Sequence, residues 1–274
     1  MQSRADIFIG YDCAVQDKNS GLARGEIRRG SLTLTEALPG DAVPAAATER
    51  LVRTIADWIS AARSGGRRVV LAVDAPLGWP EPMGRALAGH FAGARLDYPA
   101  NDLFRRETDR VVRSLYGRQT LDVGADRIAR TALRALEVLE QVRQFTGLDV
   151  PVAVEDRALS PEFDAGCVAI EAYPAGWLAA THRLVRGYRA DAAVRRTLFD
   201  GIWEGHAEVT RDEVCENPHV FDASVCVQIA RDFVHHRCVS PQEIGVAVDI
   251  AKREGWIWLP RPDATTASPS EAPE

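Results

Sequence analysis

The sequence predicts an α/β protein built on one mixed sheet, and two patterns support this fold class. Three short apolar segments, residues 7–11, 69–73 and 167–170, have the composition of strands covered on both faces. Amphipathic segments alternate with them, the clearest being residues 48–62 and 128–145. An alternation of buried strands and amphipathic helices is typical of a sheet flanked by helices.

The residues after the first strand predict a hairpin. Residues 17–21 have the composition of a turn, and residues 22–36 contain two segments separated by Arg28-Arg29-Gly30. We therefore expect three sequential antiparallel strands, followed by the helix at 48–62. The strand at 69–73 comes next, and Pro76, Gly78 and Pro80 end it soon after Asp74.

The middle of the chain is predicted to be helical. From about residue 81 to residue 166 the strand signal is weak, which indicates a helical insertion before the strand at 167–170. A pair of helices is expected over residues 176–204. We interpret residues 1–260 as a single domain that contains this insertion, and residues 261–274 as a disordered tail rich in Pro, Ser, Thr, Ala and acids.

The last long helix has the strongest start signal in the chain. Asn217 can cap a helix, and Pro218 suits its first position, so a helix is predicted from there to about residue 235. Helical spacing puts Val225, Cys226, Ile229 and Phe233 on the inward side, and Gln228, Arg231 and Asp232 on the outer side. Asp222 falls on the inward side. An inward carboxylate needs a cationic partner or a metal ion.

Composition narrows the class of protein. The formal net charge of −6 lacks the basic excess typical of duplex-binding proteins, and no apolar run approaches the ~18 residues of a membrane span. The five cysteines are scattered without a Cys-x-x-Cys pair, which argues against a disulfide framework or a zinc site. We expect reduced, partly buried thiols in a cytoplasmic protein without a membrane partner.

Acidic residues follow each of the three apolar strands. Asp12, Asp74 and Glu171 stand where these strands end. Open α/β sheets keep their ligand sites at the carboxyl edge of parallel strands. If the three strands are parallel neighbours, the three carboxylates converge on one edge, and Asp222 can reach them from the last helix.

Several motifs together resemble a known family. They are Gly10-Tyr11-Asp12, Val73-Asp74-Ala75-Pro76-Leu77-Gly78, Arg106 with Asp109, Glu171-Ala172-Tyr173-Pro174, Asp222-Ala223, and Glu254-Gly255-Trp256-Ile257. With the order of elements, they make the chain similar to the family called domain of unknown function 429, predicted nucleases of the RNase H-like fold. Residues 79–104 and 201–216 match none of its motifs.

The resemblance implies a specific fold and site. The five strands would lie in the order 3-2-1-4-5, flanked by helices, with the helical insertion between strands 4 and 5. Asp12, Asp74 and Asp222 would bind Mg²⁺ or Mn²⁺, and Glu171 would join them in catalysis. Hard divalent ions prefer oxygen ligands, and a pair of them ~3.5–4 Å apart can promote in-line hydrolysis of a phosphodiester. The expected activity is therefore a metal-dependent nuclease or phosphodiesterase.

Each acid also has a simpler interpretation. Asp12 can be a turn residue at a strand end, and Asp222 can pair with a buried arginine. Glu171 can be a fourth ligand or the structural partner of Arg106. The sequence leaves these alternatives open.

Basic residues are locally abundant before the long amphipathic helix. Eight arginines and four acids lie between residues 104 and 134. Such an excess suits a nucleic acid or another phosphodiester, although alternating charge is also typical of a solvated helix face. From the family motif we expect Arg106, with Arg105 beside it, to bind substrate.

Two other function classes are compatible with this fold. ATP-dependent phosphotransferases and ATPases share the strand order and an acid after the first strand, but usually follow that acid with a glycine-rich phosphate turn, which Cys13-Ala14-Val15-Gln16-Asp17 is not. A non-catalytic binding module could retain the acids for structure. Fold alone does not separate these classes, and the oligomeric state is not predicted.

Overall fold

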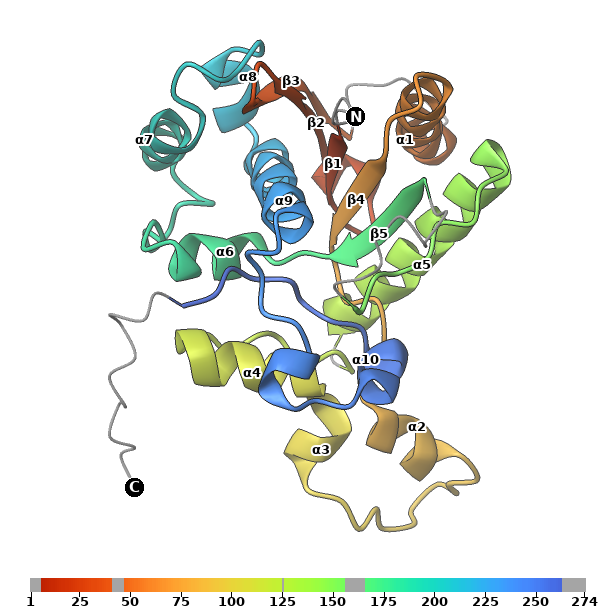
Figure 1. Ribbon diagram of the computed structural model, residues 1–274. Coiled ribbons are helices and arrows are strands. Elements are labelled where there is room, and N and C mark those ends of the chain that lie inside the picture. The colour runs from red at the N-terminus through yellow and green to blue at the C-terminus, as the bar shows by residue number, and fades with distance from the viewer. Residues whose placement is uncertain (1–5, 41–46, 125, 156–165, 263–274) are drawn as a thin grey trace.

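The computed structural model of the protein describes residues 6–40, 47–124, 126–155 and 166–262, and a five-stranded mixed sheet lies at its centre (Figure 1). Its strands run in the order β3-β2-β1-β4-β5, which confirms the predicted fold class and strand order. The strand bounds are Ile7–Asp12 for β1, Gly21–Arg28 for β2, Ser31–Pro39 for β3, Val69–Asp74 for β4 and Cys167–Glu171 for β5.

Strand direction and register bring the acids to one edge of the sheet. Strand β1 is antiparallel to β2 and parallel to β4, and β4 is parallel to β5. Asp12 is the register partner of Asp74, and Glu171 pairs with Val73, one residue earlier on β4. The predicted convergence of the three strand ends is therefore confirmed.

Helices cover both faces of the sheet and explain the unbroken apolar runs. Alternate strand residues such as Phe8 and Val70 belong to a core that includes helix α9 (Pro218–Val234). Their neighbours, such as Ile9 and Leu71, pack in a second core with helices α1 (Ala47–Ser64) and α5 (Asp126–Thr146). Because side chains alternate along a strand, residues facing both layers must be apolar.

Helix α9 is buried more completely than its periodicity predicted. Its apolar stripe faces the sheet, but Gln228 and Asp232, expected on the outer side, are buried too, while Arg231 is partly exposed. The helices α6 (Pro174–Ala180), α7 (Ala192–Trp203) and α8 (Arg211–Cys215) pack around it. The indole nitrogen of Trp177 on α6 donates to the Asp232 carboxylate at 2.8 Å, so this buried acid is satisfied by a hydrogen bond.

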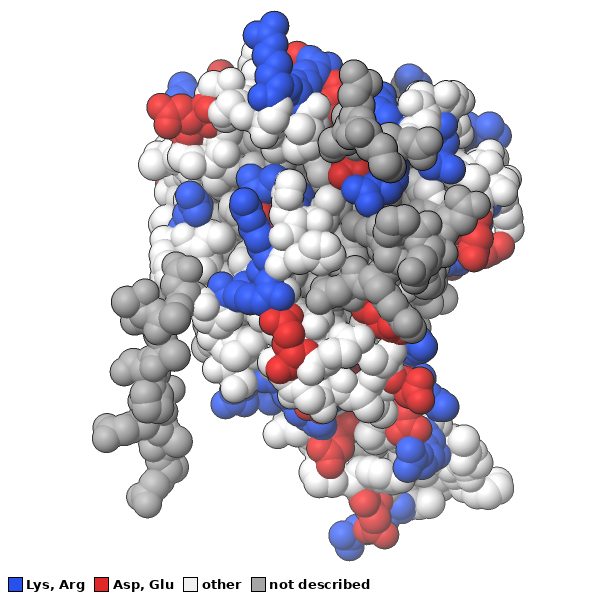
Figure 2. Space-filling view, in the orientation of Figure 1, with Lys and Arg blue, Asp and Glu red and all other residues white. Residues whose placement is uncertain are grey.

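The chain between β4 and β5 is helical, as expected from the sequence. Helices α2 (Glu81–Leu87), α3 (Ala100–Phe104) and α4 (Glu107–Tyr116) precede α5. Helices α2 and α3 and the chain between them extend away from the sheet at the bottom of Figure 1, and the same extension is visible in Figure 2. Residues 79–104, which matched no motif, thus contain the two short helices of this extension.

The C-terminal segment ties this extension to the sheet. Helix α10 (Val248–Glu254) ends in a carboxylate that accepts the amide N–H groups of Glu81 and Glu107, the first residues of α2 and α4. Ile257 then forms a bridge beside Glu171 on β5. The short 3₁₀ helices η1 (Asp17–Asn19) and η3 (Gln242–Ile244) complete the described elements.

Two sequence expectations concern the remaining chain. All five cysteines are free and buried, in agreement with the prediction of reduced thiols. The predicted disordered tail lies, from residue 263 onward, outside the described residues. Within the described ranges, no helix combines the length and the apolar character needed to cross a membrane.

Candidate metal centre

Two of the three predicted metal ligands stand at the ends of neighbouring strands. Asp12 closes β1 and is buried, whereas Asp74 closes β4 and is partly exposed. Pro76 and Gly78 end the strand signal after β4, so the Asp74 side chain lies at the edge of the sheet and not within it. Parallel pairing in register then sets the two carboxylates side by side.

The third carboxylate comes from α9, because the start of this helix is fixed. The Asn217 side chain accepts the His219 amide at 2.8 Å, and Pro218 occupies the first helical position, which confirms the predicted cap. Asp222 lies early in this helix with no exposed surface. A glycine is required beneath it, since a Cβ atom on Gly10 of β1 would lie 1.9 Å from the Ala223 carbonyl oxygen.

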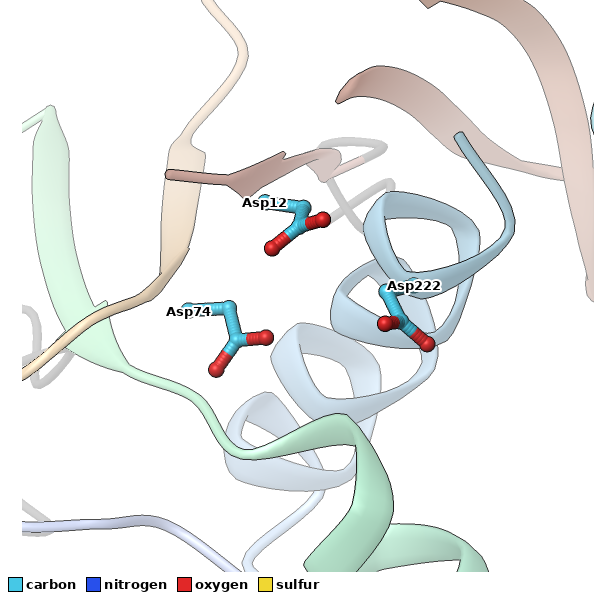
Figure 3. Close-up of side chains that lie close together, drawn as sticks. All are labelled: Asp12, Asp74 and Asp222. Atoms are coloured by element: carbon cyan, nitrogen blue, oxygen red, sulfur yellow. The ribbon is translucent and has the colours of Figure 1, made fainter. Parts of the chain in front are cut away.

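The three aspartates form one cluster. One carboxylate oxygen from each of Asp12, Asp74 and Asp222 lies within 4.8 Å of the others. Figure 3 shows the three side chains, from β1, β4 and α9, around a common space. The prediction that Asp222 faces the sheet within reach of the other acids is confirmed.

Burial and mutual repulsion make this cluster costly when it is ionised. Burial raises the pKa of Asp12, and the nearby Asp222 raises it further. Burial also raises the pKa of Asp74, with added contributions from Asp12 and Asp222. The pKa of Asp222 is raised by burial, but less, because Arg189 opposes the change. A counter-charge at this point would therefore favour the ionised form of all three acids.

Three polar residues that the sequence analysis did not select surround the cluster. Arg189 forms ion pairs with Asp222 and, at 3.5 Å, with Asp12. The Nδ1 atom of His219 lies 2.7 Å from an Asp12 oxygen, and the Tyr188 hydroxyl donates to Asp222 at 2.9 Å.

Only one of these three residues had a detectable sequence signal. His219 precedes Asp222 by three residues on the same helix, a spacing that places both on one face. Tyr188 and Arg189 lie between α6 and α7, in a segment without helical or strand periodicity.

The donor set fits a hard divalent cation. All three candidate ligands are carboxylates, which are the ligands that Mg²⁺ and Mn²⁺ prefer. The Oδ2 atom of Asp222 is buried without a hydrogen bond, although Arg189 pairs with it electrostatically. That oxygen retains lone pairs for an ion. The Arg189 side chain is 45 % exposed and can leave the cluster toward solvent when an ion replaces its charge.

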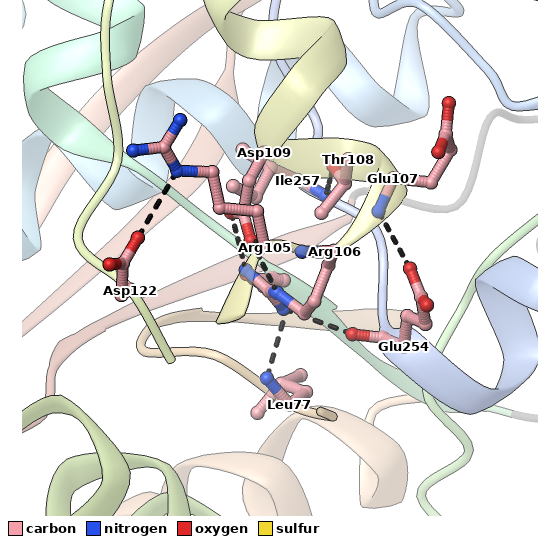
Figure 4. Close-up of polar contacts among 10 residues, drawn as sticks. Leu77, Arg105, Arg106, Glu107, Thr108, Asp109, Asp122, Glu254 and Ile257 are labelled. Carbon is pink, nitrogen blue, oxygen red and sulfur yellow. Dashed lines mark hydrogen bonds and ion pairs between the residues drawn. The ribbon is translucent and has the colours of Figure 1, made fainter. Parts of the chain in front are cut away.

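Glu171 and Arg106 form a separate buried ion pair. The Arg106 guanidinium donates to Glu171 at 2.7 and 2.8 Å, to Asp109 at 3.0 and 3.1 Å, and to the Glu254 carbonyl at 3.0 Å. Figure 4 shows Arg106 beside Asp109 and Glu254. Glu171 also accepts the Leu77 amide. Of the two roles considered for Glu171, the geometry gives the structural pairing with Arg106, and Glu171 lies outside the three-aspartate cluster.

The two arginines expected to bind substrate both pair with carboxylates, although Arg106 lines the cavity beside the aspartates. Arg106 is 1 % exposed, and each of its five guanidinium N–H groups has an acceptor, so none is left for a phosphate. Arg105 pairs with Asp122 at 3.2 Å (Figure 4). It is not among the residues that line the cavity beside the aspartates. The sequence offered Glu171 as one possible partner of Arg106, but it did not show that Asp109 and the Glu254 carbonyl occupy the remaining donors or that Asp122 pairs with Arg105.

A cavity of about 320 Å³ opens beside the cluster. Asp12 and Asp74 line it, together with His219 and Arg189, and Leu121 and Ile128 supply apolar wall. This volume is at the lower end for small-molecule sites. The acids are thus accessible to a ligand of modest size.

A family model matches most of the chain. The family described as "Protein of unknown function (DUF429)" matches residues 10–244, which include all four acids selected from the sequence. This agrees with the resemblance drawn from the motifs. No curated protein matches the chain.

Proposed function

The chain belongs to the DUF429 family, and we propose that it hydrolyses a phosphodiester with Mg²⁺ or Mn²⁺ bound by Asp12, Asp74 and Asp222. The observation that carries the proposal is the convergence of three carboxylates, from two strand ends and a helix, beside a cavity. A bound divalent ion would supply Lewis-acid stabilisation of phosphoryl charge and activation of water.

His219 is suited to accept a proton during the reaction. Burial and the neighbouring Arg189 lower its pKa, so the ring is neutral at neutral pH. In the tautomer in which Nδ1–H donates to the Asp12 carboxylate, the lone pair is on Nε2. This tautomer requires Arg189 to give up its own 3.1 Å contact with Nδ1, as it does when it leaves the cluster. His219 lines the cavity, where Nε2 can take a proton from an attacking water.

Arg189 is suited to hold the substrate's charge. In the structure its guanidinium neutralises part of the aspartate cluster from a partly exposed position. Once an ion satisfies the carboxylates, this guanidinium can pair with a non-bridging phosphate oxygen in the same cavity. Arg189 would thus pair with the aspartates in the free protein and with the phosphate in the complex.

The phosphotransferase alternative receives less support from the residues after β1. The Ala14 amide donates to the Ser20 hydroxyl, and the Ser20 and Asn19 amides donate to backbone carbonyls of the same turn. These N–H groups are therefore not available to hold a nucleotide phosphate in the way that a glycine-rich phosphate loop does.

The surface charge favours a small or single-stranded substrate over a long duplex. On the face drawn in Figure 2, basic and acidic side chains are interspersed, without a broad basic stripe. The net charge of −6 points the same way.

The proposal is tested by hydrolysis of bis(p-nitrophenyl) phosphate and of a short single-stranded oligonucleotide, with and without Mn²⁺. We expect Mn²⁺-dependent cleavage that Asp74→Asn reduces by at least about a hundredfold. The matched control is Asp57→Asn, which removes an exposed carboxylate on α1, away from the cluster. Equal activity in the two variants, or cleavage that persists after chelation of metal ions, would contradict the proposal.

A further inference from the structure

A second cavity also has Asp74 in its lining. It has a volume of about 300 Å³ and is lined by Asp74, Arg118, Tyr173, Gly187, Tyr188 and Arg189. Three of these residues, Asp74, Tyr173 and Arg189, also line the first cavity. The two cavities therefore share a wall of which a predicted metal ligand is part.

The second cavity has the donors of an anion site. Its lining residues include two arginines, two tyrosines and one carboxylate, although the Tyr188 hydroxyl already donates to Asp222. That carboxylate, Asp74, is also the one that would be neutralised by a bound cation. Once a cation balances the charge of Asp74, the two arginines leave the lining of the cavity with a net positive charge.

Arg118 differs from three arginines that precede it on the same segment. Arg105, Arg106 and Arg110 each form an ion pair with a carboxylate. Within the described parts of the chain, Arg118 has no such ion pair, and its Nε atom is buried without a hydrogen-bond partner. A buried guanidinium N–H without an acceptor costs free energy, which a ligand oxygen would recover.

The backbone explains how Arg118 reaches this position. Gly117 ends α4 in the left-handed conformation, with a φ of 62°, and its amide donates to the Arg113 carbonyl. The chain turns there, and the next side chain lies beside the Tyr173 phenol, whose raised pKa is partly lowered by the Arg118 charge. Arg113, one turn earlier on α4, is exposed to solvent instead.

We propose that this second cavity binds a phosphate group of the substrate, held by Arg118 and Tyr173, next to the phosphodiester that is hydrolysed at the aspartates. Arg189 lines both cavities and would lie between the two phosphates. The inference rests on the proposed function for the position of the cleaved bond. The substrate class that follows is one with two neighbouring phosphates. A single-stranded oligonucleotide supplies the second as an internal diester, and a 5′-phosphorylated dinucleotide supplies it as a terminal monoester.

The test is a double-mutant-type cycle of binding measurements, in which the second phosphate is removed from the ligand, the Arg118 guanidinium is removed from the protein, or both are removed. Affinities of thymidine dinucleotide, its 5′-phosphorylated form and thymidine trinucleotide are measured by calorimetry with Ca²⁺, on the parent protein and on Arg118→Gln. In the parent, we expect a second phosphate to raise affinity by about tenfold or more, as a charge-assisted hydrogen bond does. In Arg118→Gln this gain should disappear, because both changes remove the same contact.

Two further variants keep the result interpretable. Arg113→Gln removes an equal charge from the surface and should retain the full gain. Arg118→Lys keeps the charge, and its folding is checked by circular dichroism; it should retain part of the gain even if Arg118→Gln is unstable. A larger gain with the 5′-phosphorylated dinucleotide identifies a terminal phosphate, and a larger gain with the trinucleotide identifies an internal one.

An unchanged gain in Arg118→Gln, or no gain in the parent, overturns the subsite. Failure of the proposed function gives a different result, because Mn²⁺ would then not bind the parent more tightly than Asp74→Asn. The subsite is tested by the affinity for the nucleotides and the proposed function by the affinity for Mn²⁺, so the two failures can be told apart on the same preparations.

Discussion

The buried charge of Arg106 should stabilise the folded protein, because its donors are already paired with protein acceptors. Arg106 is enclosed with Glu171 and Asp109, and all its donors are used. Removal of one partner from such a pair leaves uncompensated buried charge. We predict that Arg106→Met lowers the free energy of unfolding by about 3–5 kcal/mol. Arg105→Met, which breaks a half-exposed pair, should cost no more than about 1 kcal/mol. Urea unfolding of both variants measures the difference, and equal losses would contradict the structural role.

Unlike Arg106, the three clustered aspartates should destabilise the folded protein when no metal ion is bound. Their pKa values are raised in the folded protein, so between the unfolded pKa, about 3.9, and the folded pKa the native state binds more protons. Stability therefore falls as pH rises through this window. We predict that Asp74→Asn melts at the same or a higher temperature than the parent at pH 8, and that its stability falls less between pH 5 and pH 8. A steeper fall in the variant would show that Asp74 is stabilised as an ion by its surroundings.

A variant of His219 can distinguish a role in proton transfer from a role in metal binding. The His219 ring contacts Asp12 but supplies no ligand atom to the three-aspartate cluster. We predict that His219→Gln reduces hydrolysis by about 10²–10⁴-fold, the usual contribution of a general base, and leaves Mn²⁺ affinity within a few-fold of the parent. Comparable losses of binding and of activity would assign His219 to the metal centre instead.

At the scale of elements, the contact between β1 and α9 builds the site. Gly10 leaves no room for a side chain against Ala223, and this close approach brings Asp222 to Asp12. We predict that Gly10→Ala destabilises the protein by at least about 1–3 kcal/mol and weakens Mn²⁺ binding. Gly201→Ala, on a helix with open space around the new methyl, should instead stabilise it by about 0.5–1 kcal/mol. Thermal unfolding distinguishes the two, and equal effects would mean that the contact is not essential.

At the scale of the whole molecule, the sheet was predictable because its strands carry a local signal. Residues 7–11, 69–73 and 167–170 are apolar on both faces, and their acids mark the edge at which they end. The full burial of α9 was not predictable in this way. Gln228 and Asp232 follow polar periodicity, but α6, α7 and α8 cover them through contacts between distant segments.

The candidate site was predictable in part because some of its residues lie on elements with a local sequence signal. Asp12, Asp74 and Asp222 lie on regular elements whose spacing places them. Arg189 lies in a turn and Arg118 in a loop, where position depends on the surrounding fold and not on a local period. The pairing of Arg106 with Glu171 was only one of two roles left open for Glu171, because a sequence does not show how many donors a partner already occupies.

The central claim is that the three-aspartate cluster binds a divalent ion, and the most direct test is calorimetric titration of Mn²⁺ into the metal-free parent and into Asp74→Asn. Three converging carboxylates with raised pKa values should bind the ion and release protons on binding, so the heat should depend on buffer ionisation. We predict one saturable event in the parent, at least about tenfold weaker in Asp74→Asn and unchanged in Asp57→Asn. A parent without saturable Mn²⁺ binding, or with the same affinity as Asp74→Asn, would contradict the account.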